Sequence, residues 1–137
     1  MSEIKFEWES GIEEVCSKLK DKKLIGIQLP DGLKVKSHTI TKKIKDLTGA
    51  NVILWGEPTY GACDLADRPL EEVGAEALIH LGHMPMPYHS EFYAIPTYFV
   101  PVKHTGKLNL KNESLEKIRE MLPKKIGLVT TAQHLHM

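Results

Sequence analysis

The chain has 137 residues, 42% of them hydrophobic, which is enough for one ordinary domain with a substantial core. Lysine and arginine together number 18, as do aspartate and glutamate, so the strongly basic character of a nucleic-acid-binding domain is excluded. No apolar run approaches the length of a membrane span, and residues 1–5 lack the pattern of a signal peptide. Because there are only two cysteines, Cys16 and Cys63, we expect free thiols in a reducing cytoplasm.

The first part of the chain alternates helix and strand signals. Ser10 and Glu13 have the spacing of a capping box, and the apolar residues that follow predict a helix with Cys16 on its buried face. Residues 24–29 form an apolar run typical of a buried strand, which a proline–aspartate–glycine turn ends. A second helix follows and is predicted to end at Gly49.

Residues 51–55 predict a second buried strand, and the turn residues beyond it lead to Cys63. Cys63 is thereby placed at the carboxyl end of a strand, just before a short helix that Asp67 is expected to cap. In open α/β sheets this edge is where ligands bind. A thiol that faces a helix N-terminus is favoured as the thiolate, which is the form that binds metals.

Two further strands are predicted at residues 77–81 and 97–102, and His83 lies just beyond the first of them. Residues 84–96 contain three prolines and cannot be regular. His80 points from a strand, so we interpret it as a hydrogen-bonded core histidine. A zinc site built from Cys63 and His83 is conceivable, although no ligand spacing requires it.

The end of the chain has two interpretations. Asn112 is predicted to cap a helix that leads to a fifth strand at residues 126–130. Residues 24–27 resemble residues 125–128, and both follow a helix and a lysine-containing turn. Residues 124–137 therefore either close the sheet or begin a second unit.

Together these elements predict an α/β protein: one Rossmann-like, three-layer domain over residues 1–137 with a mostly parallel sheet of four to five strands. The carboxyl ends of parallel strands meet at one edge, so three polar turns converge there. Candidate substrate-binding residues, chosen from these edge positions, are Gln28, Asp31, Tyr60, Gly61 and His83.

Four motifs in this order resemble the archaeal diphthamide synthase family, 2-(3-amino-3-carboxypropyl)histidine synthase. They are residues 28–33 (QLPDGL), 55–64 (WGEPTYGACD), 80–83 (HLGH) and 130–134 (TTAQH). The tyrosine–glycine–alanine–cysteine turn is the most specific of them, and the four together cover nearly the whole chain.

The resemblance implies an enzyme that holds a 4Fe–4S cluster with three cysteines, one from each of three similar domains, and Cys63 matches the first of these. Such enzymes cleave S-adenosylmethionine, a co-substrate bound at the open iron site. The 3-amino-3-carboxypropyl radical then adds to a histidine of elongation factor 2, and methylthioadenosine is the by-product. The resemblance therefore implies elongation factor 2 as a protein substrate in the cytoplasm, with no direct role for nucleic acid or membrane.

This sequence departs from the family because the other two cluster cysteines have no counterpart and Cys16 lies in no family motif. We consider an excised or separately encoded first domain completed by a partner chain, a short member in which several copies each supply Cys63, and a remnant without the chemistry. The alternative to an enzyme is a non-catalytic binding or assembly module for elongation factor 2 or a partner subunit.

Overall fold

The structure is a computed structural model that describes the chain except for residues 1–5, 8, 88–91, 106–110 and 136–137. In chain order the elements are β1 (Phe6–Glu7), α1 (Glu9–Ser17), β2 (Leu24–Gln28), α2 (Asp31–Lys34), α3 (Ser37–Thr48), β3 (Asn51–Leu54), α4 (Asp67–Glu72), β4 (Ala77–Leu81), β5 (Thr97–Val100), β6 (Lys103–His104), α5 (Asn112–Met121) and the 3₁₀ turn η1 (Ala132–His134).

Four of the strands form a parallel sheet in the order β3-β2-β4-β5, which confirms the predicted α/β class and parallel sheet. Each strand is a short apolar run bounded by turn residues, and β4 is buried along its whole length, as a parallel strand covered on both faces should be. A separate pair joins β1 and β6 antiparallel.

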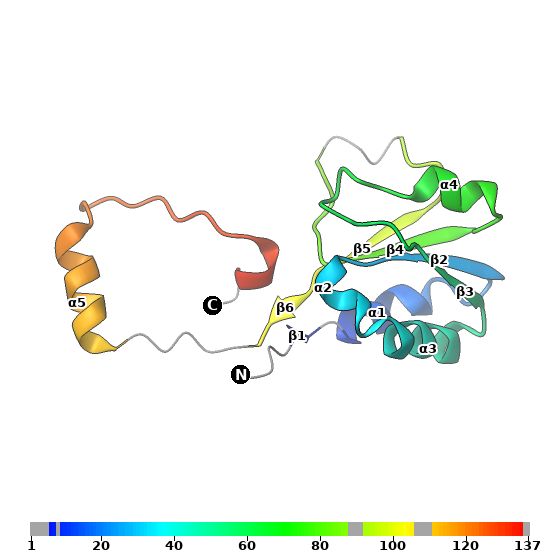
Figure 1. Ribbon diagram of the computed structural model, residues 1–137, viewed down its shortest axis with the longest axis horizontal. Helices are drawn as coiled ribbons and strands as arrows, with labels where there is room; N and C mark the ends of the chain where they lie inside the picture. Colours follow the sequence, from blue (N-terminus) through cyan, green and yellow to red (C-terminus); the bar gives the residue numbers. More distant parts are fainter. Residues whose placement is uncertain (1–5, 8, 88–91, 106–110, 136–137) are drawn as a thin grey trace.

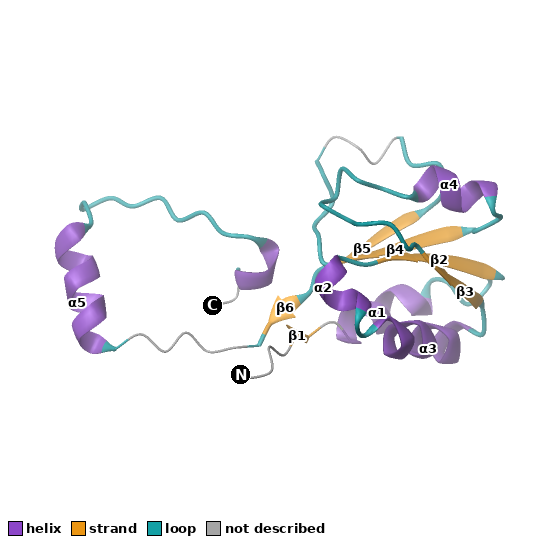
Figure 2. Ribbon diagram, in the orientation of Figure 1, coloured by secondary structure: helices purple, strands orange, loops and turns teal. Residues whose placement is uncertain are grey.

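Helices cover both faces of the sheet, so the domain has three layers (Figures 1 and 2). α1 and α3 pack together on one face, over a core that includes Ile25 and Ile27 of β2. α4 covers the other face, where Leu70 packs with Leu78 of β4. Gly26 lets α4 approach closely, because a Cβ there would lie 2.7 Å from a methyl carbon of Leu70.

Three expectations about local structure are wrong. α1 begins at Glu9, so Ser10 lies within the helix instead of capping it. Neither Asn112 nor Asp67 is an N-cap residue, since each is the first residue of its helix. The carboxylate of Asp67 instead accepts a hydrogen bond of 2.7 Å from the amide of Ala94, which ties the connection before β5 to α4.

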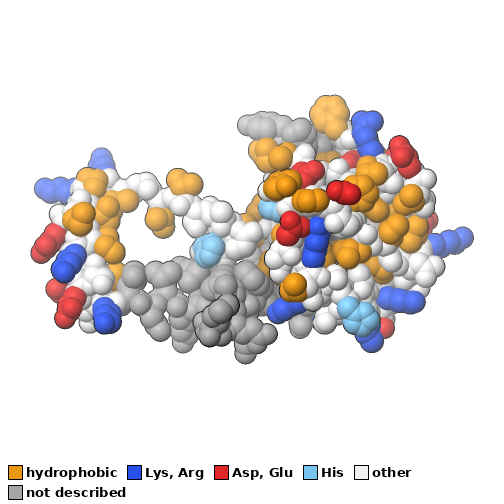
Figure 3. Space-filling view, in the orientation of Figure 1, with side chains coloured by type: hydrophobic (Ala, Val, Ile, Leu, Met, Phe, Trp, Pro, Cys, Tyr) orange, Lys and Arg blue, Asp and Glu red, His pale blue; other side chains and the backbone are white. Residues whose placement is uncertain are grey.

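The predicted fifth strand is not found, because residues 126–130 have no regular secondary structure and pair with none of the strands that the structure describes. Leu128 and Val129 are 90% and 95% exposed, and α5 has no buried residue. Figure 1 shows α5 standing apart from the sheet, and Figure 3 shows hydrophobic side chains at its surface. The apolar pattern that predicted a strand is present, but the described residues supply no partner for it.

Candidate functional site

The carboxyl ends of β2, β3 and β4 meet at the point where the chain order of the sheet reverses. From β2 the chain passes to β3 on one side, and it later returns to β4 on the other. In parallel sheets such a switch point opens a crevice that binds ligands. Gln28 ends β2 and pairs in register with His80 of β4, so both buried side chains lie on the same face of the sheet, the face that α4 covers.

Gln28 fastens the loop that follows β3 to the sheet. Its side chain is fully buried, and its Nε2 donates to the carbonyl oxygen of Asp64 over 2.6 Å. Its Oε1 accepts from the amide of Ala66 over 3.1 Å. The segment next to Cys63 is therefore held at two backbone atoms by one amide. Gln28 was a candidate ligand-binding residue, but in the structure it supports the loop from beneath.

His80 and His83 extend this polar network toward the surface. Nδ1 of His80 lies 3.0 Å from Oε1 of Gln28, and its Nε2 lies 2.9 Å from Nδ1 of His83. Burial lowers the pKa of His80 to about 4, with a smaller contribution from His83, and burial lowers the pKa of His83 as well. The interpretation of His80 as a hydrogen-bonded core histidine is confirmed, while His83 is half-buried at the rim.

Gly82 brings the first and third motifs into contact. Its φ is +89°, and a Cβ at this position would lie 2.5 Å from Cγ of Pro30. The carbonyl oxygen of Gly82 accepts a hydrogen bond from the side chain of Gln133, which belongs to the fourth motif. All four motifs therefore reach the same edge of the sheet.

The loop that carries Cys63 is a compact turn with the sulfur at its surface. The amide of Asp64 donates to the carbonyl of Gly61 over 3.1 Å, and the amide of Tyr60 donates to the carboxylate of Asp64 over 3.2 Å. Cys63 is exposed, as is the ring of Tyr60. α4 begins four residues after Cys63, at Asp67, so the cysteine is not part of the helix cap, and the expectation that its thiol faces a helix N-terminus stays a prediction.

Asp31 lies outside this network. It is the first residue of α2, is exposed, and forms an ion pair of 2.7 Å with Lys34. Lys34 in turn donates to the carbonyl oxygens of Gly56 and Glu57, at the start of the Cys63 loop. Sequence reasoning missed Lys34, although its i,i+3 spacing from Asp31 was a signal.

The two thiols have different environments. Cys16 is buried in the α1 face of the core, as predicted, and burial raises its pKa to about 11. Among the described residues no group of three or more histidine, cysteine, aspartate or glutamate side chains is placed to hold a metal ion. The described residues therefore offer no third ligand for a zinc site built on Cys63 and His83. Cys63 is the exposed one of the two thiols.

We therefore expect a thiol reagent to modify Cys63 rapidly and Cys16 only after unfolding. The exposed sulfur meets the reagent directly, whereas the buried one is both shielded and held protonated. Time-resolved labelling should show one fast thiol in the native chain and two in denaturant. The Cys63→Ala variant should lose the fast thiol, and fast labelling of Cys16 would contradict the packing of α1.

The buried His80 predicts that stability falls in acid. Its pKa is about 4 in the folded chain against 6.5 ordinarily, so between these values the unfolded state binds more protons. The stabilising contribution is complete above about pH 6.5 and is lost as the pH falls toward 4, by up to about 3 kcal/mol. Denaturant unfolding across this range measures it, with His38→Gln as a control that retains the slope. Equal stability at both ends of the range would contradict the burial of His80.

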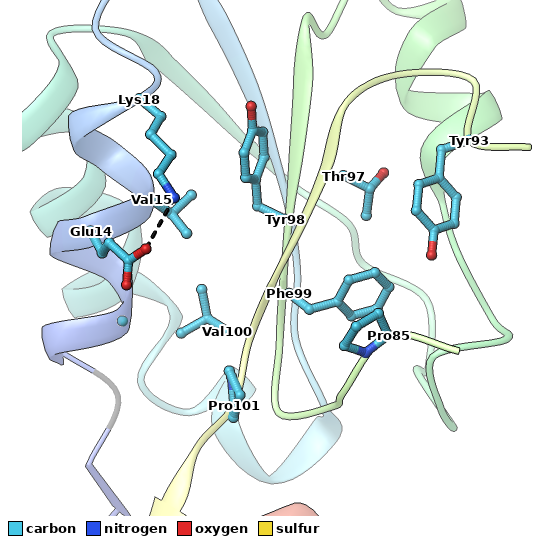
Figure 4. Close-up of a pocket in the computed structure, with 11 residues that line it drawn as sticks. Glu14, Val15, Lys18, Pro85, Tyr93, Thr97, Tyr98, Phe99, Val100 and Pro101 are labelled. Atoms are coloured by element: carbon cyan, nitrogen blue, oxygen red, sulfur yellow. Dashed lines mark hydrogen bonds and ion pairs between the residues drawn. The ribbon is translucent and has the colours of Figure 1, made fainter. Parts of the chain in front are cut away.

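A cleft of about 400 Å³ lies elsewhere, along the free edge of β5 (Figure 4). Tyr98 points from β5 toward α1, and Phe99 points to the other side, toward Tyr93. None of Gln28, Cys63, His80 and His83 lines this cleft. Its lining residues are Gly11, Glu14, Val15, Lys18, Pro85, Tyr93, Thr97, Tyr98, Phe99, Val100 and Pro101.

None of the helices in the described ranges has the length and apolar character needed to cross a bilayer.

Comparison with known proteins finds relatives that match most of this chain in sequence. The profile of the family described as "Putative diphthamide synthesis protein" matches residues 29–137. The 2-(3-amino-3-carboxypropyl)histidine synthase of Pyrococcus horikoshii is 40% identical over 124 residues, which cover 86% of this chain and 35% of that protein. The protein of the same name from Methanocaldococcus jannaschii is 29% identical over 139 residues, covering 93% and 40% respectively.

A solved structure shares the fold. The crystal structure of Dph2 from Pyrococcus horikoshii with a 4Fe–4S cluster superposes with a TM-score of 0.76 at 36% sequence identity, covering 98% of this chain and 37% of that one. The chain thus spans 35% to 40% of the length of the two synthases. These matches confirm the resemblance drawn from the four motifs, and the chain belongs to the diphthamide synthesis protein family.

Proposed function

We propose that this chain supplies Cys63 as one thiolate ligand of a 4Fe–4S cluster in a transferase that modifies a histidine of elongation factor 2. The observation that carries the proposal is the exposed sulfur of Cys63, presented from a braced turn at the carboxyl edge of a parallel sheet. A related structure that holds such a cluster supports it. The substrate implies a cytoplasmic location.

The residues present fit one corner of such a cluster. A cluster needs thiolates, and Cys63 is the exposed one of the two cysteines. When bound, the cluster would supply the reducing power that breaks a carbon–sulfur bond of S-adenosylmethionine, so that the 3-amino-3-carboxypropyl group can be transferred. In this proposal Gln28 and Asp64 hold the cysteine turn, and Asp31, Tyr60, Gly61 and His83 contact the substrates.

The other thiolates come from outside the described fold, either from further protein that completes this unit or from further copies of Cys63. The exposed apolar side chains of α5 and of residues 126–130 support the first source. They follow the same order, helix, lysine turn and apolar run, as α1 and β2. We infer that residues 112–130 begin a second α/β unit, against which these side chains are buried.

Anaerobic reconstitution with iron and sulfide tests the ligand. With the other thiolates supplied, either by the protein that completes this unit or by further copies of the chain, we expect the wild type to retain iron and to show the absorption of a cluster, and Cys63→Ala to lose both. Cys16→Ala is the matched control, since it removes a thiol that is buried in the core, and it should retain iron. Equal iron in Cys63→Ala and the wild type would refute the proposal. The solution mass without oxygen and with iron shows whether three copies share a cluster.

A second candidate function is a non-catalytic module that binds elongation factor 2 or a partner subunit. The described residues contain one exposed thiol, which is fewer than the three that a cluster of this family needs, and this favours the non-catalytic module. Co-purification with the factor that is unaffected by Cys63→Ala, without formation of methylthioadenosine, would support this function over the enzyme.

A further inference from the structure

Hydrogen bonds around Gln28 determine which nitrogen of His80 carries the hydrogen. The carbonyl oxygen of Asp64 can only accept and the amide of Ala66 can only donate, so the two ends of the Gln28 side-chain amide are assigned without ambiguity. The Oε1 atom that accepts from Ala66 is the atom that lies 3.0 Å from Nδ1 of His80. An acceptor at this distance requires a donor, so Nδ1 of His80 is protonated.

The same reasoning then applies to His83. His80 is fully buried, and its low pKa keeps the ring neutral, with a single N–H group. Because that group is at Nδ1, Nε2 of His80 is an acceptor, and Nδ1 of His83 donates to it over 2.9 Å. The lone pair of a neutral His83 is therefore on Nε2, which makes no hydrogen bond within the part of the chain that the structure describes.

The surroundings of this nitrogen favour a positively charged donor. The carboxylate of Asp64 raises the pKa of His80 against the larger effect of burial, and His80 contacts His83, so a negative charge lies at this end of the network. His83 itself is half-buried, so a hydrogen bond at its Nε2 is only partly screened by water. A neutral acceptor near a carboxylate attracts a cationic N–H group and repels an anion.

We propose that Nε2 of His83 is a binding site for an ammonium group of the ligand, and that Gln28 and His80 are positioning residues that hold His83 in this one tautomer. The identity of the ligand rests on the function proposed above, under which the group is the α-ammonium of S-adenosylmethionine. The tautomer rests on the hydrogen bonds alone. One buried amide thus orients both the cysteine turn and the histidine beside it.

Nitrogen chemical shifts of isotope-labelled histidine test the tautomer at a pH where both rings are neutral. We expect Nδ1 of His83 to be protonated and Nε2 to be unprotonated, and His80 to show the same pattern. The measurement is made on the wild-type chain, so it does not depend on a variant that might unfold. Protonation of His83 at Nε2 would overturn the inference.

The ligand is tested with His83→Asn, which keeps an N–H donor for His80 and removes the outer acceptor. We expect its affinity for S-adenosylmethionine to fall roughly tenfold or more, as for loss of a hydrogen bond to a charged group, while its affinity for the analogue without the α-amino group is unchanged. An equal loss for both molecules would overturn the ammonium site.

S-adenosylmethionine is titrated into the chain with and without reconstituted iron, and binding is followed by the nitrogen chemical shifts of His83. Failure to perturb His83 in either form overturns the ligand assignment. Iron retention by His83→Asn separates this inference from the cluster proposal, since the cluster proposal fails only if Cys63→Ala binds as much iron as the wild type.

Discussion

Replacing Gln28 with leucine is expected to lower the free energy of unfolding by about 3–5 kcal/mol, because one substitution leaves several buried polar groups without partners. The carbonyl of Asp64, the amide of Ala66 and Nδ1 of His80 all depend on this side chain. Each unsatisfied buried group costs about 1–3 kcal/mol, and the losses overlap. A domain at the low end of the usual range of about 5–15 kcal/mol would then be close to unfolding.

Denaturant unfolding measures the loss, and hydrogen exchange at the amide of Ala66 locates it. Gln28→Glu is expected to be intermediate, because one oxygen still accepts from Ala66 and His80 while the other opposes the carbonyl of Asp64. Gln133→Leu is the matched control, since it removes a single, part-buried hydrogen bond, and should cost about 1 kcal/mol. A Gln28→Leu variant as stable as this control would show that the network does not hold the loop.

The sequence predicted the scaffold well because the strands are short apolar runs bounded by turn residues. Residues 51–55, followed by glycine and proline, were sufficient to place Cys63 at the carboxyl edge of a parallel sheet, and the described fold agrees. The convergence of the motifs followed from the common direction of parallel strands. Neither prediction required knowledge of side-chain contacts.

The inner structure of the site was not predictable in this way. Gln28 and His80 are 52 residues apart, and only the register of β2 with β4 brings them together. A glutamine at a strand end looks the same in sequence whether it contacts a ligand or supports a loop. The strand predicted at residues 126–130 failed for a different reason. An apolar pattern indicates that a segment tends to be buried, but it does not identify the surface against which the segment packs.

Replacing Gly82 with alanine is the second change with a large expected effect, of about 2–6 kcal/mol on the free energy of unfolding. A φ of +89° is unfavourable for any residue with a Cβ and costs about 1–3 kcal/mol. The new Cβ would also lie 2.5 Å from Cγ of Pro30, so the two chain segments must separate. Overpacking of this kind adds about 1–3 kcal/mol.

Gly74→Ala separates these two costs. Gly74 has a φ of +86°, but a Cβ there would meet nothing within 4 Å, so this variant carries the backbone strain alone. The excess loss in Gly82→Ala measures the collision with Pro30. Pro30→Ala removes Cγ and Cδ, so in the double variant with Gly82→Ala about 1–3 kcal/mol should be recovered. Equal losses at the two glycines would mean that the turns carrying Pro30 and His83 can move apart freely.

The functional consequence follows from the position of Gly82 between His80 and His83. If the turn moves away from Pro30, the 2.9 Å contact between the two imidazole rings lengthens, and His83 loses the partner that fixes its tautomer. Gly82→Ala should therefore change the nitrogen shifts of His83 under conditions where the chain is still folded, whereas Gly74→Ala, at the far end of α4, should leave them unchanged. Pro30 of the first motif and Gly82 of the third then have one role, which is to keep His83 in contact with His80 while Gln28 holds the cysteine turn.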